Sequence, residues 1–445
     1  MAIELNKNKY WVLCAMLILL NHHINEAEGL EALAQAPANG YIAVAPGTGS
    51  KAPTSQVSNS GSIGVEAPTL GRGFKADQAP RPKYKSKPLI SVLPNKITDN
   101  GTKSGEPQVP CFMIFGDSLV DVGNNNILKT WARADYSPYG IDFKPFGPTG
   151  RFCNGRTTVD FIAELLGFDH YIPPSELTNG TDILQGLNFA SAAAGIREET
   201  AQHLGDRSTM KEQIDNFKNK ILEMNVLLGG PQNTRDHLGK CLFQVGFGSN
   251  DYLNNYFLPS VYNTSKLFTP EQYADDLIKQ FTTLLLEIYD LGARKFALAG
   301  VSQVGCSPNS LALGSQDGTC VKTINDANEM FNTRLKTLVD TLNKDHPDAK
   351  FTYINSYGLF QELKDRASTL GFKNTNEGCC GVGKFKGLIT CLPTQIPCPN
   401  RDEYLFWDAY HPTEATNRIG ARRSYIKLLP TDAYPYDIRT LITLK

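Results

Sequence analysis

The sequence predicts an α/β protein whose mainly parallel sheet is covered by helices on both faces. Short apolar runs recur along the chain, as is typical of strands that are buried on both sides. Between them lie longer stretches whose apolar residues fall on one helical face. The composition, with 445 residues of which 41% are hydrophobic and 20% charged, is that of a globular protein. Such alternation favours a parallel sheet.

The first half of the folded region carries three expected strands and two expected helices. Gly116 follows the first apolar run and Gly246 follows the third, so each of these strands ends at a glycine. In chain order the elements are a strand at Phe112–Phe115, a helix at Thr157–Leu166, a strand at Leu187–Ala190, a helix at Ser208–Met224 and a strand at Leu242–Val245.

The second half begins with the clearest helix, Pro270–Leu291. Thr269 is a favourable N-cap, Gln272 completes a capping box, and Gly292 follows the last turn. Proline at the first helical position is also favourable. Three further elements follow: a strand at Lys295–Ala299, a helix at Val321–Leu342 and a strand at Lys350–Ile354.

Residues 1–34 have the layout of a secretory signal peptide. Trp11–Leu20 is an apolar run that follows Lys7 and Lys9, and small residues follow at Ala32–Ala34. Ten residues are too few to span a bilayer, although a buried helix or a membrane anchor is the alternative. No later segment has 18 consecutive apolar residues, so stable membrane insertion of the mature chain is not expected.

Residues 35–108 are predicted to form a flexible extension. Gly, Pro and Ser supply 26 of these 74 residues, and 9 Lys and Arg stand against 4 Asp and Glu. Such a segment cannot bury enough apolar surface to order itself. It could be a propeptide, a wall-binding arm or a plain linker. The remainder, residues 109–445, is expected to be one catalytic domain.

Cysteines and glycosylation sequons point to the secretory pathway. Outside the presumed signal peptide there are nine cysteines, so disulfides are expected and at least one thiol stays unpaired. Cys306 with Cys320 is the first pair we expect. A zinc site is the alternative, but there is no CxxC pair, and we expect no histidine at ligand spacing. The sequons begin at Asn100, Asn179 and Asn263.

Charge and motifs exclude several classes of protein. The formal net charge of −1 gives no bulk attraction for nucleic acid. The chain contains neither G-x-x-x-x-G-K-[ST] nor G-x-G-x-x-G, which argues against a nucleotide enzyme. Ligands of open α/β sheets bind at the carboxyl ends of the strands, so functional residues are sought there.

A serine nucleophile is the first chemical candidate. Ser118 lies where the first strand ends, but a serine at neutral pH needs a base and a group that orients the base. His411 is the histidine that stands in a compact motif, with Asp408 three residues before it. In a tight turn Asp408 could accept from the His411 ring and fix its tautomer. Such a pair on its own is more often a capping aspartate beside a surface histidine.

The ends of two other strands offer groups for an oxyanion hole. Asn250, in the segment Gly248–Tyr252, provides a side-chain amide, and Gly195 allows its N–H to approach a ligand closely. Taken singly, an asparagine like Asn250 is more often a turn former, and a glycine like Gly195 is more often a loop hinge.

Four motifs in order resemble those of plant-type GDSL esterases/lipases of the SGNH hydrolase superfamily. The resemblance spans roughly residues 109–430, and Gly305-Cys306 and EGCCG at 377–381 also fit it. Ser302-Gln303 replaces a proline common in this family, Phe247 is bulkier than usual, and the long extension is unusual. The four motifs are FGDSLVDVGNNN at 115–126, NFASAAAGI at 188–196, GSNDY at 248–252 and FWDAYHPTE at 406–414.

The resemblance implies a flavodoxin-like three-layer α/β/α sandwich and assigns roles to individual residues. Ser118 is then the nucleophile, His411 the general base and acid, and Asp408 the residue that orients His411. The N–H groups of Ser118 and Gly195 and the Asn250 amide form the oxyanion hole. No metal or other cofactor is required, and the substrate is an acyl ester or lipid. The family also implies a secreted protein of the cell wall or apoplast.

Two rival functions remain from the sequence. An acyltransferase that passes the acyl group to an alcohol would need the same residues, so product analysis alone separates it from an esterase. A secreted binding protein that kept the fold without turnover is the other, and the intact set of motif residues argues against it. Natural substrate, protein partners and oligomeric state are not predicted.

Overall fold

The computed structural model describes residues 106–445, and the predicted signal peptide, nearly all of the predicted extension and the sequon at Asn100 lie outside this range. The described part begins just before the predicted domain boundary. Gln108 already contacts the domain, because its main-chain N–H donates to Leu166 O at 2.8 Å.

A six-stranded sheet forms the centre of the domain, in the order β2-β1-β3-β4-β5-β8. The first five strands in this order are parallel, and β8 at the edge is antiparallel to β5. A second sheet pairs β6 with β7. The strands are β1 (Phe112–Gly116), β2 (Gly186–Asn188), β3 (Leu242–Gly246), β4 (Lys295–Ala299), β5 (Lys350–Ile354), β6 (Asn374–Gly378), β7 (Tyr404–Phe406) and β8 (Ala433–Tyr434).

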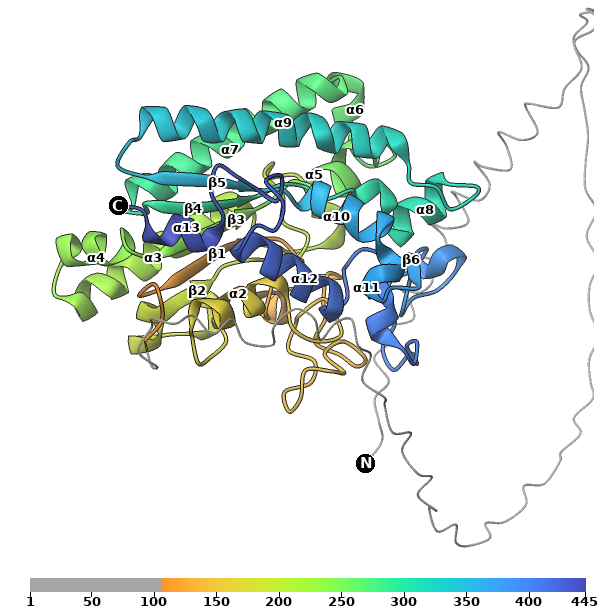
Figure 1. Cartoon of the computed structure of the whole chain (residues 1–445), viewed down its shortest axis with the longest axis horizontal. Coiled ribbons are helices and arrows are strands. Elements are labelled where there is room, and N and C mark those ends of the chain that lie inside the picture. The colour runs from red at the N-terminus through yellow and green to blue at the C-terminus, as the bar shows by residue number, and fades with distance from the viewer. Residues whose placement is uncertain (1–105) are drawn as a thin grey trace, which may run out of the picture. The chain divides into compact units, whose positions relative to one another are not determined.

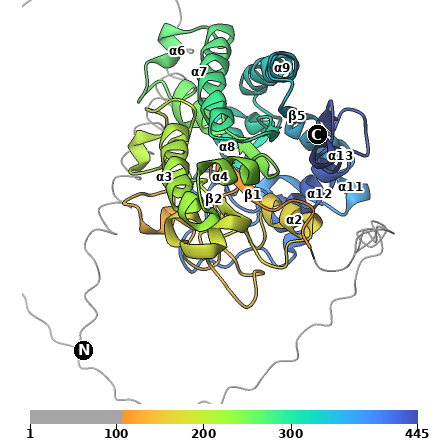
Figure 2. The ribbon, with the colours of Figure 1, turned by 90° about the vertical axis from the view of Figure 1, so that its left-hand side faces the viewer.

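Helices cover both faces of the six-stranded sheet, as the sequence predicts (Figures 1 and 2). The apolar sides of α3, α7 and α9 share one buried cluster with the strands, and those of α2, α12 and α13 share another. The helices are α2 (Thr158–Leu166), α3 (Met210–Leu228), α4 (Pro231–Leu238), α5 (Ser249–Asp251), α6 (Thr264–Leu267), α7 (Pro270–Asp290), α8 (Pro308–Gly314), α9 (Lys322–Asp345), α10 (Ser356–Asp365), α11 (Ala367–Leu370), α12 (Glu414–Tyr425) and α13 (Ile438–Thr443).

Helix ends follow the capping residues. In α7 the Thr269 side chain accepts from the N–H of Gln272, whose own side chain accepts from the N–H of Thr269, which is the expected capping box. In α3 an equivalent box at Thr209 sets the start at Met210, and Gly229 in the left-handed conformation ends the helix, beyond the expected Met224. The apolar pattern located both helices, and the caps set their ends.

The register of the strands determines where the site is built. β1 lies between β2 and β3, with Ile114 opposite Asn188 and Gly116 opposite Gly246. The loops that follow these three strands therefore begin side by side, at the carboxyl ends of the strands. Across residues 106–445, none of the helices combines the length and apolarity needed to cross a bilayer.

Candidate active site

Ser118, His411 and Asp408 form a continuous hydrogen-bonded series. His411 Nε2 lies 2.8 Å from Ser118 Oγ, and His411 Nδ1 lies 2.8 and 2.9 Å from the two carboxylate oxygens of Asp408. A carboxylate only accepts hydrogen bonds, so Nδ1 carries the ring proton and Nε2 is left to accept from the serine. The structure thus brings together three residues from opposite ends of the domain sequence.

A tight loop after β7 fixes the Asp408–His411 geometry. Trp407 N–H donates to His411 O at 2.7 Å, which closes the loop. Inside it, Asp408 Oδ1 accepts from the main-chain N–H groups of Tyr410 at 2.9 Å and His411 at 2.8 Å. The carboxylate therefore holds both the backbone and the ring of the histidine. Thr413 then caps α12 and ends the loop.

The Asp408 carboxyl is buried and remains the charged partner. Burial by itself would raise its pKa, but the charge of His411 and hydrogen bonds from His411, Tyr139 and Tyr410 hold that pKa below its ordinary value. The Tyr139 hydroxyl, 2.6 Å from Asp408 Oδ2, is a donor that sequence analysis did not identify.

Two neighbours fix the orientation of the Asn250 amide, which follows β3. Its Oδ1 accepts from Asn254 Nδ2 at 2.8 Å, and its Nδ2 donates to Ala194 O at 3.0 Å. One of the two Nδ2 protons remains for a ligand. Within the described residues, the main-chain N–H groups of Ser118 and Gly195 donate to no protein acceptor. Three donors thus follow three adjacent strands.

Glycine is required at 195 because the loop is crowded there. A Cβ at this position would lie 2.5 Å from Thr200 Cγ2 and 2.7 Å from Asp251 Oδ1, closer than such atoms approach. The requirement is one of space, because the φ angle of Gly195 is ordinary.

Three buried aspartates brace the loops that carry these groups. Asp251 accepts from the N–H groups of Ile196 at 2.9 Å and Arg197 at 3.1 Å, and from the Thr200 hydroxyl at 2.8 Å. Asp121 accepts from three main-chain N–H groups, including that of Ala192 at 3.0 Å. Burial raises the pKa values of Asp117, Asp121 and Asp251 to about 6, against the opposing effect of these hydrogen bonds. Their place inside the motifs GDSLVD and GSND was the available sequence signal.

A small pocket lies next to the segment that carries Ser118. Leu119, next to Ser118 in the chain, and Phe247 both line it, so the bulky Phe247 narrows the space available there. The full lining is Phe115, Asp117, Leu119, Val120, Gln244, Gly246, Phe247, Ser249, Ala299, Gly300, Val301, Ser302 and Ser356.

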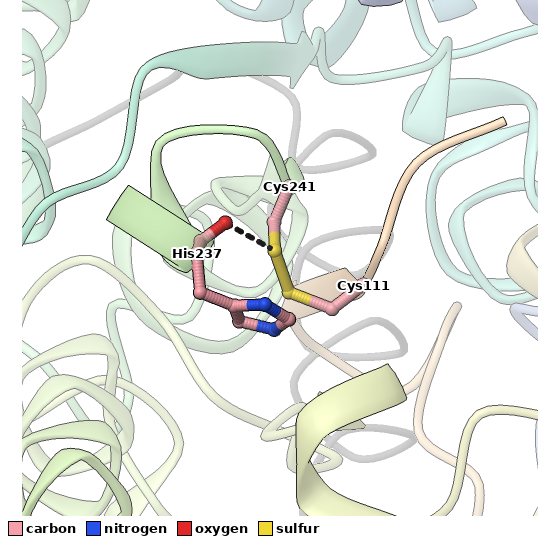
Figure 3. Close-up of side chains that lie close together, drawn as sticks. All are labelled: Cys111, His237 and Cys241. Atoms are coloured by element: carbon pink, nitrogen blue, oxygen red, sulfur yellow. Dashed lines mark hydrogen bonds between the residues drawn. A yellow bond between two sulfur atoms is a disulfide. The ribbon is translucent and has the colours of Figure 1, made fainter. Parts of the chain in front are cut away.

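A possible metal-ligand group lies at the other end of the sheet, contrary to the expectation that no histidine stands at ligand spacing from the cysteines (Figure 3). His237 precedes Cys241 by four residues, and the ligand atoms of Cys111, His237 and Cys241 lie within 4.8 Å of one another. However, the two sulfurs form a disulfide, and His237 Nε2 bonds Leu184 O at 2.9 Å. Neither sulfur is then a thiolate, the form that binds zinc.

Four disulfides are present in residues 106–445, and the expected pair Cys306–Cys320 is among them. Cys153 is the thiol left over in this range, and it is buried. The other pairs are Cys111–Cys241, Cys379–Cys398 and Cys380–Cys391.

A mainly parallel sheet covered by helices, together with a serine, a histidine and an aspartate hydrogen-bonded in series, is an arrangement typical of serine hydrolases. The family model described as GDSL-like Lipase/Acylhydrolase matches residues 112–423. GDSL esterase/lipase At1g29660 from Arabidopsis thaliana is 58% identical over 76% of this chain and 93% of its own length. GDSL esterase/lipase At5g45670 from the same plant is 53% identical over 80% of this chain and 98% of its own.

The chain therefore belongs to the GDSL esterase/lipase family and is a carboxylic ester hydrolase with the SGNH hydrolase fold. Among solved structures, the gut microbial diltiazem-metabolizing enzyme BT4096 is 13% identical over 68% of this chain and 46% of that chain, with a TM-score of 0.31.

Proposed function

We propose that the protein is a secreted serine esterase that cleaves carboxylic esters of lipids or small acyl esters through an acyl-enzyme. The observation that carries this proposal is the 2.8 Å approach of His411 Nε2 to Ser118 Oγ, with Asp408 behind the ring. It supports a nucleophilic serine because a neutral imidazole in this position accepts the hydroxyl proton as the serine attacks.

The first step forms a bond between Ser118 Oγ and the carbonyl carbon of the ester. His411 Nε2 takes the hydroxyl proton, and Asp408 stabilises the imidazolium that results. The negative charge that develops on the carbonyl oxygen is met by the N–H groups of Ser118 and Gly195 and by the Asn250 amide. The tetrahedral intermediate then expels the alcohol, which receives the proton from His411.

Water completes the reaction by the reverse sequence of steps. His411 removes a proton from a water molecule, which attacks the acyl-enzyme, and the same donors stabilise the second oxyanion. The acid is released, and Ser118 regains its proton from His411. These steps require no metal ion or organic cofactor.

Secretion is supported by the cysteine usage. Four disulfides in 340 described residues are expected of a chain that folds in an oxidising compartment. Asn179 and Asn263 are both exposed, so a glycan on either would meet solvent. We propose that the protein is released to the cell wall or apoplast and carries glycans at these two sites.

The test is hydrolysis of p-nitrophenyl esters of short and medium chain length by the secreted protein and by Ser118→Ala. We expect turnover to fall by several orders of magnitude in the variant, and an acyl adduct on the wild type that the variant lacks, measured by intact mass. Wild-type protein that is folded yet shows neither turnover nor adduct would contradict the proposal. An adduct without release would instead indicate transfer to an alcohol acceptor.

A further inference from the structure

The second carboxylate oxygen of Asp408 has its own donor. Tyr139, in the long loop between β1 and α2, donates its hydroxyl proton to Asp408 Oδ2 at 2.6 Å, while the loop N–H groups bond Oδ1. Among the described residues, the side chains that donate to this carboxylate are those of His411 and Tyr139. Tyr139 therefore acts on the same charge that orients the histidine.

We propose that Tyr139 is a positioning residue for the Asp408–His411 pair: its hydroxyl fixes the plane of the Asp408 carboxylate and limits how tightly that carboxylate holds the protonated His411 ring. The inference rests on the serine mechanism proposed above, and it adds a fourth residue to the hydrogen-bonded series.

The direction of each proton follows from the groups present. Tyr139 has one hydroxyl proton, and an ionised carboxylate can only accept, so this proton points to Asp408. Thr390 Oγ1, 3.1 Å from the Tyr139 oxygen, must then donate to it. Burial, and then the negative charge of Asp408, raise the pKa of Tyr139 well above its ordinary value, so the hydroxyl stays a donor. Such chains of hydrogen bonds polarise one another.

The Tyr139 ring is buried and packed against other aromatic rings. Its side chain is 1% exposed, and its ring makes edge contacts with Tyr136, Phe152 and Trp407, with centroid distances of 5.2 to 6.1 Å. Phe152 also lies against the His411 ring, at 5.0 Å between centroids. The hydroxyl is therefore held in place by the same aromatic cluster that contacts the histidine.

Other ionisable groups near the pair do not replace this donor. Burial, and then the charge of Asp408, raise the pKa values of Tyr136 and Tyr410, so both stay neutral. Tyr136 donates to Cys391 O at 2.9 Å. Asp117, whose pKa burial raises to about 6, is the other carboxyl that interacts with His411. Asp117 is unchanged in every variant described below.

The experiment compares pH profiles of kcat/KM for the wild type and Tyr139→Phe. Without the hydroxyl, Asp408 carries more uncompensated charge and stabilises the imidazolium, which cannot act as a base. We expect the acid limb to move to higher pH by about half a unit. We also expect kcat/KM at the optimum to fall roughly three- to tenfold. Thr390→Val, which removes the donor to Tyr139, should move the limb in the same direction but less.

Tyr256→Phe is the matched control, because Tyr256 is also buried and its hydroxyl bonds a main-chain oxygen, Phe268 O at 3.0 Å. Its acid limb should stay at the wild-type pH. An unmoved limb in Tyr139→Phe, or an equal shift in the control, would refute the positioning role.

Nuclear magnetic resonance titration of the His411 ring gives a second measure that does not need turnover. If wild-type turnover did not depend on Ser118, the proposed function would fail. The titration midpoint in Tyr139→Phe would still decide this inference, with a shift to higher pH supporting it and no shift overturning it.

Discussion

Asn250 illustrates how single side chains are given their direction in this site. Its amide could rotate by half a turn and present oxygen instead of nitrogen, and the Nδ2 of Asn254, 2.8 Å from its Oδ1, prevents this. The backbone near Gly195 is held in a similar way, because Asp251 accepts hydrogen bonds from two N–H groups of that loop. Precise placement of donors is what separates stabilisation of an oxyanion from ordinary binding.

Replacing Asn250 with alanine should lower kcat by about 10²- to 10³-fold with little change in KM, because the amide would act on charge that develops after binding. Steady-state kinetics with a p-nitrophenyl ester measures this. Asn233→Ala, on the exposed surface of α4, is the control and should leave kcat unchanged. A raised KM with unchanged kcat would show that Asn250 binds the ground state instead.

At the residue scale, the sequence could identify the candidate site residues by type, but not the residues that hold them in place. Ser118, Asp408 and His411 stand in compact motifs, and the structure places their side chains within hydrogen-bond distance of one another, while their catalytic roles stay predictions. Tyr139 carries no such signal, because a tyrosine 269 positions before its partner is one of 18 in the chain. Only the folded loop shows which carboxylate it contacts.

At the scale of helices and strands, apolar patterns locate each element, and buried polar groups connect the elements to one another. β4 and β5 have the bounds that their apolar runs predict. β6 was not predicted because its sequence, NTNEG, has no apolar run, and β8 was missed because it is two residues long. These elements depend on their partners for hydrogen bonds, which no local pattern records.

Asp251 connects the loop after β2 to α5, and its ionisation should affect stability. Its pKa is about 6 in the folded protein, against an ordinary value of 3.8. Between these two values the folded state binds the proton and the unfolded state does not, so stability falls as pH rises. The free energy of unfolding of the wild type, minus that of Asp251→Asn, should decrease by about 1.4 kcal/mol per pH unit from pH 4 to 6.

Urea unfolding at several pH values in this range tests the slope. Asp345→Asn, at the exposed end of α9, shows the effect of removing a surface carboxylate. A difference that stayed constant or grew with pH would mean that folding does not raise the Asp251 pKa.

At the scale of the whole molecule, disulfides link the chain at both ends of the six-stranded sheet. Cys111–Cys241 links the residues that precede β1 and β3, which are 130 positions apart. At the opposite end, Cys380–Cys391 and Cys379–Cys398 close the segment that brings Thr390 to Tyr139. The first disulfide thus supports the sheet, and the two at the opposite end support the site.

Removing the Cys111–Cys241 disulfide with Cys111→Ala and Cys241→Ala should reduce the free energy of unfolding by roughly 2 to 5 kcal/mol. Below the unfolding temperature, kcat should remain near the wild-type value, because the bond lies at the edge of the sheet away from Ser118. Denaturant unfolding and esterase kinetics measure the two effects. Cys153→Ala, which leaves all four bonds intact, is the control. A large loss of kcat in the double variant would show coupling across the sheet.

At this scale the sequence predicted the α/β class, and the motifs predicted the family and its fold. The pairing of the cysteines was beyond it, apart from Cys306–Cys320, because nine cysteines allow many combinations. The folded chain selects among them by bringing distant strand ends together.

The order of the site residues along the chain has a consequence for biosynthesis. Ser118 leaves the ribosome well before Asp408 and His411, which are made after every parallel strand of the large sheet. A chain that stops before residue 408 therefore carries Ser118 without its two hydrogen-bonded partners. The proposed chemistry is therefore possible only after the whole parallel part of the large sheet has been translated.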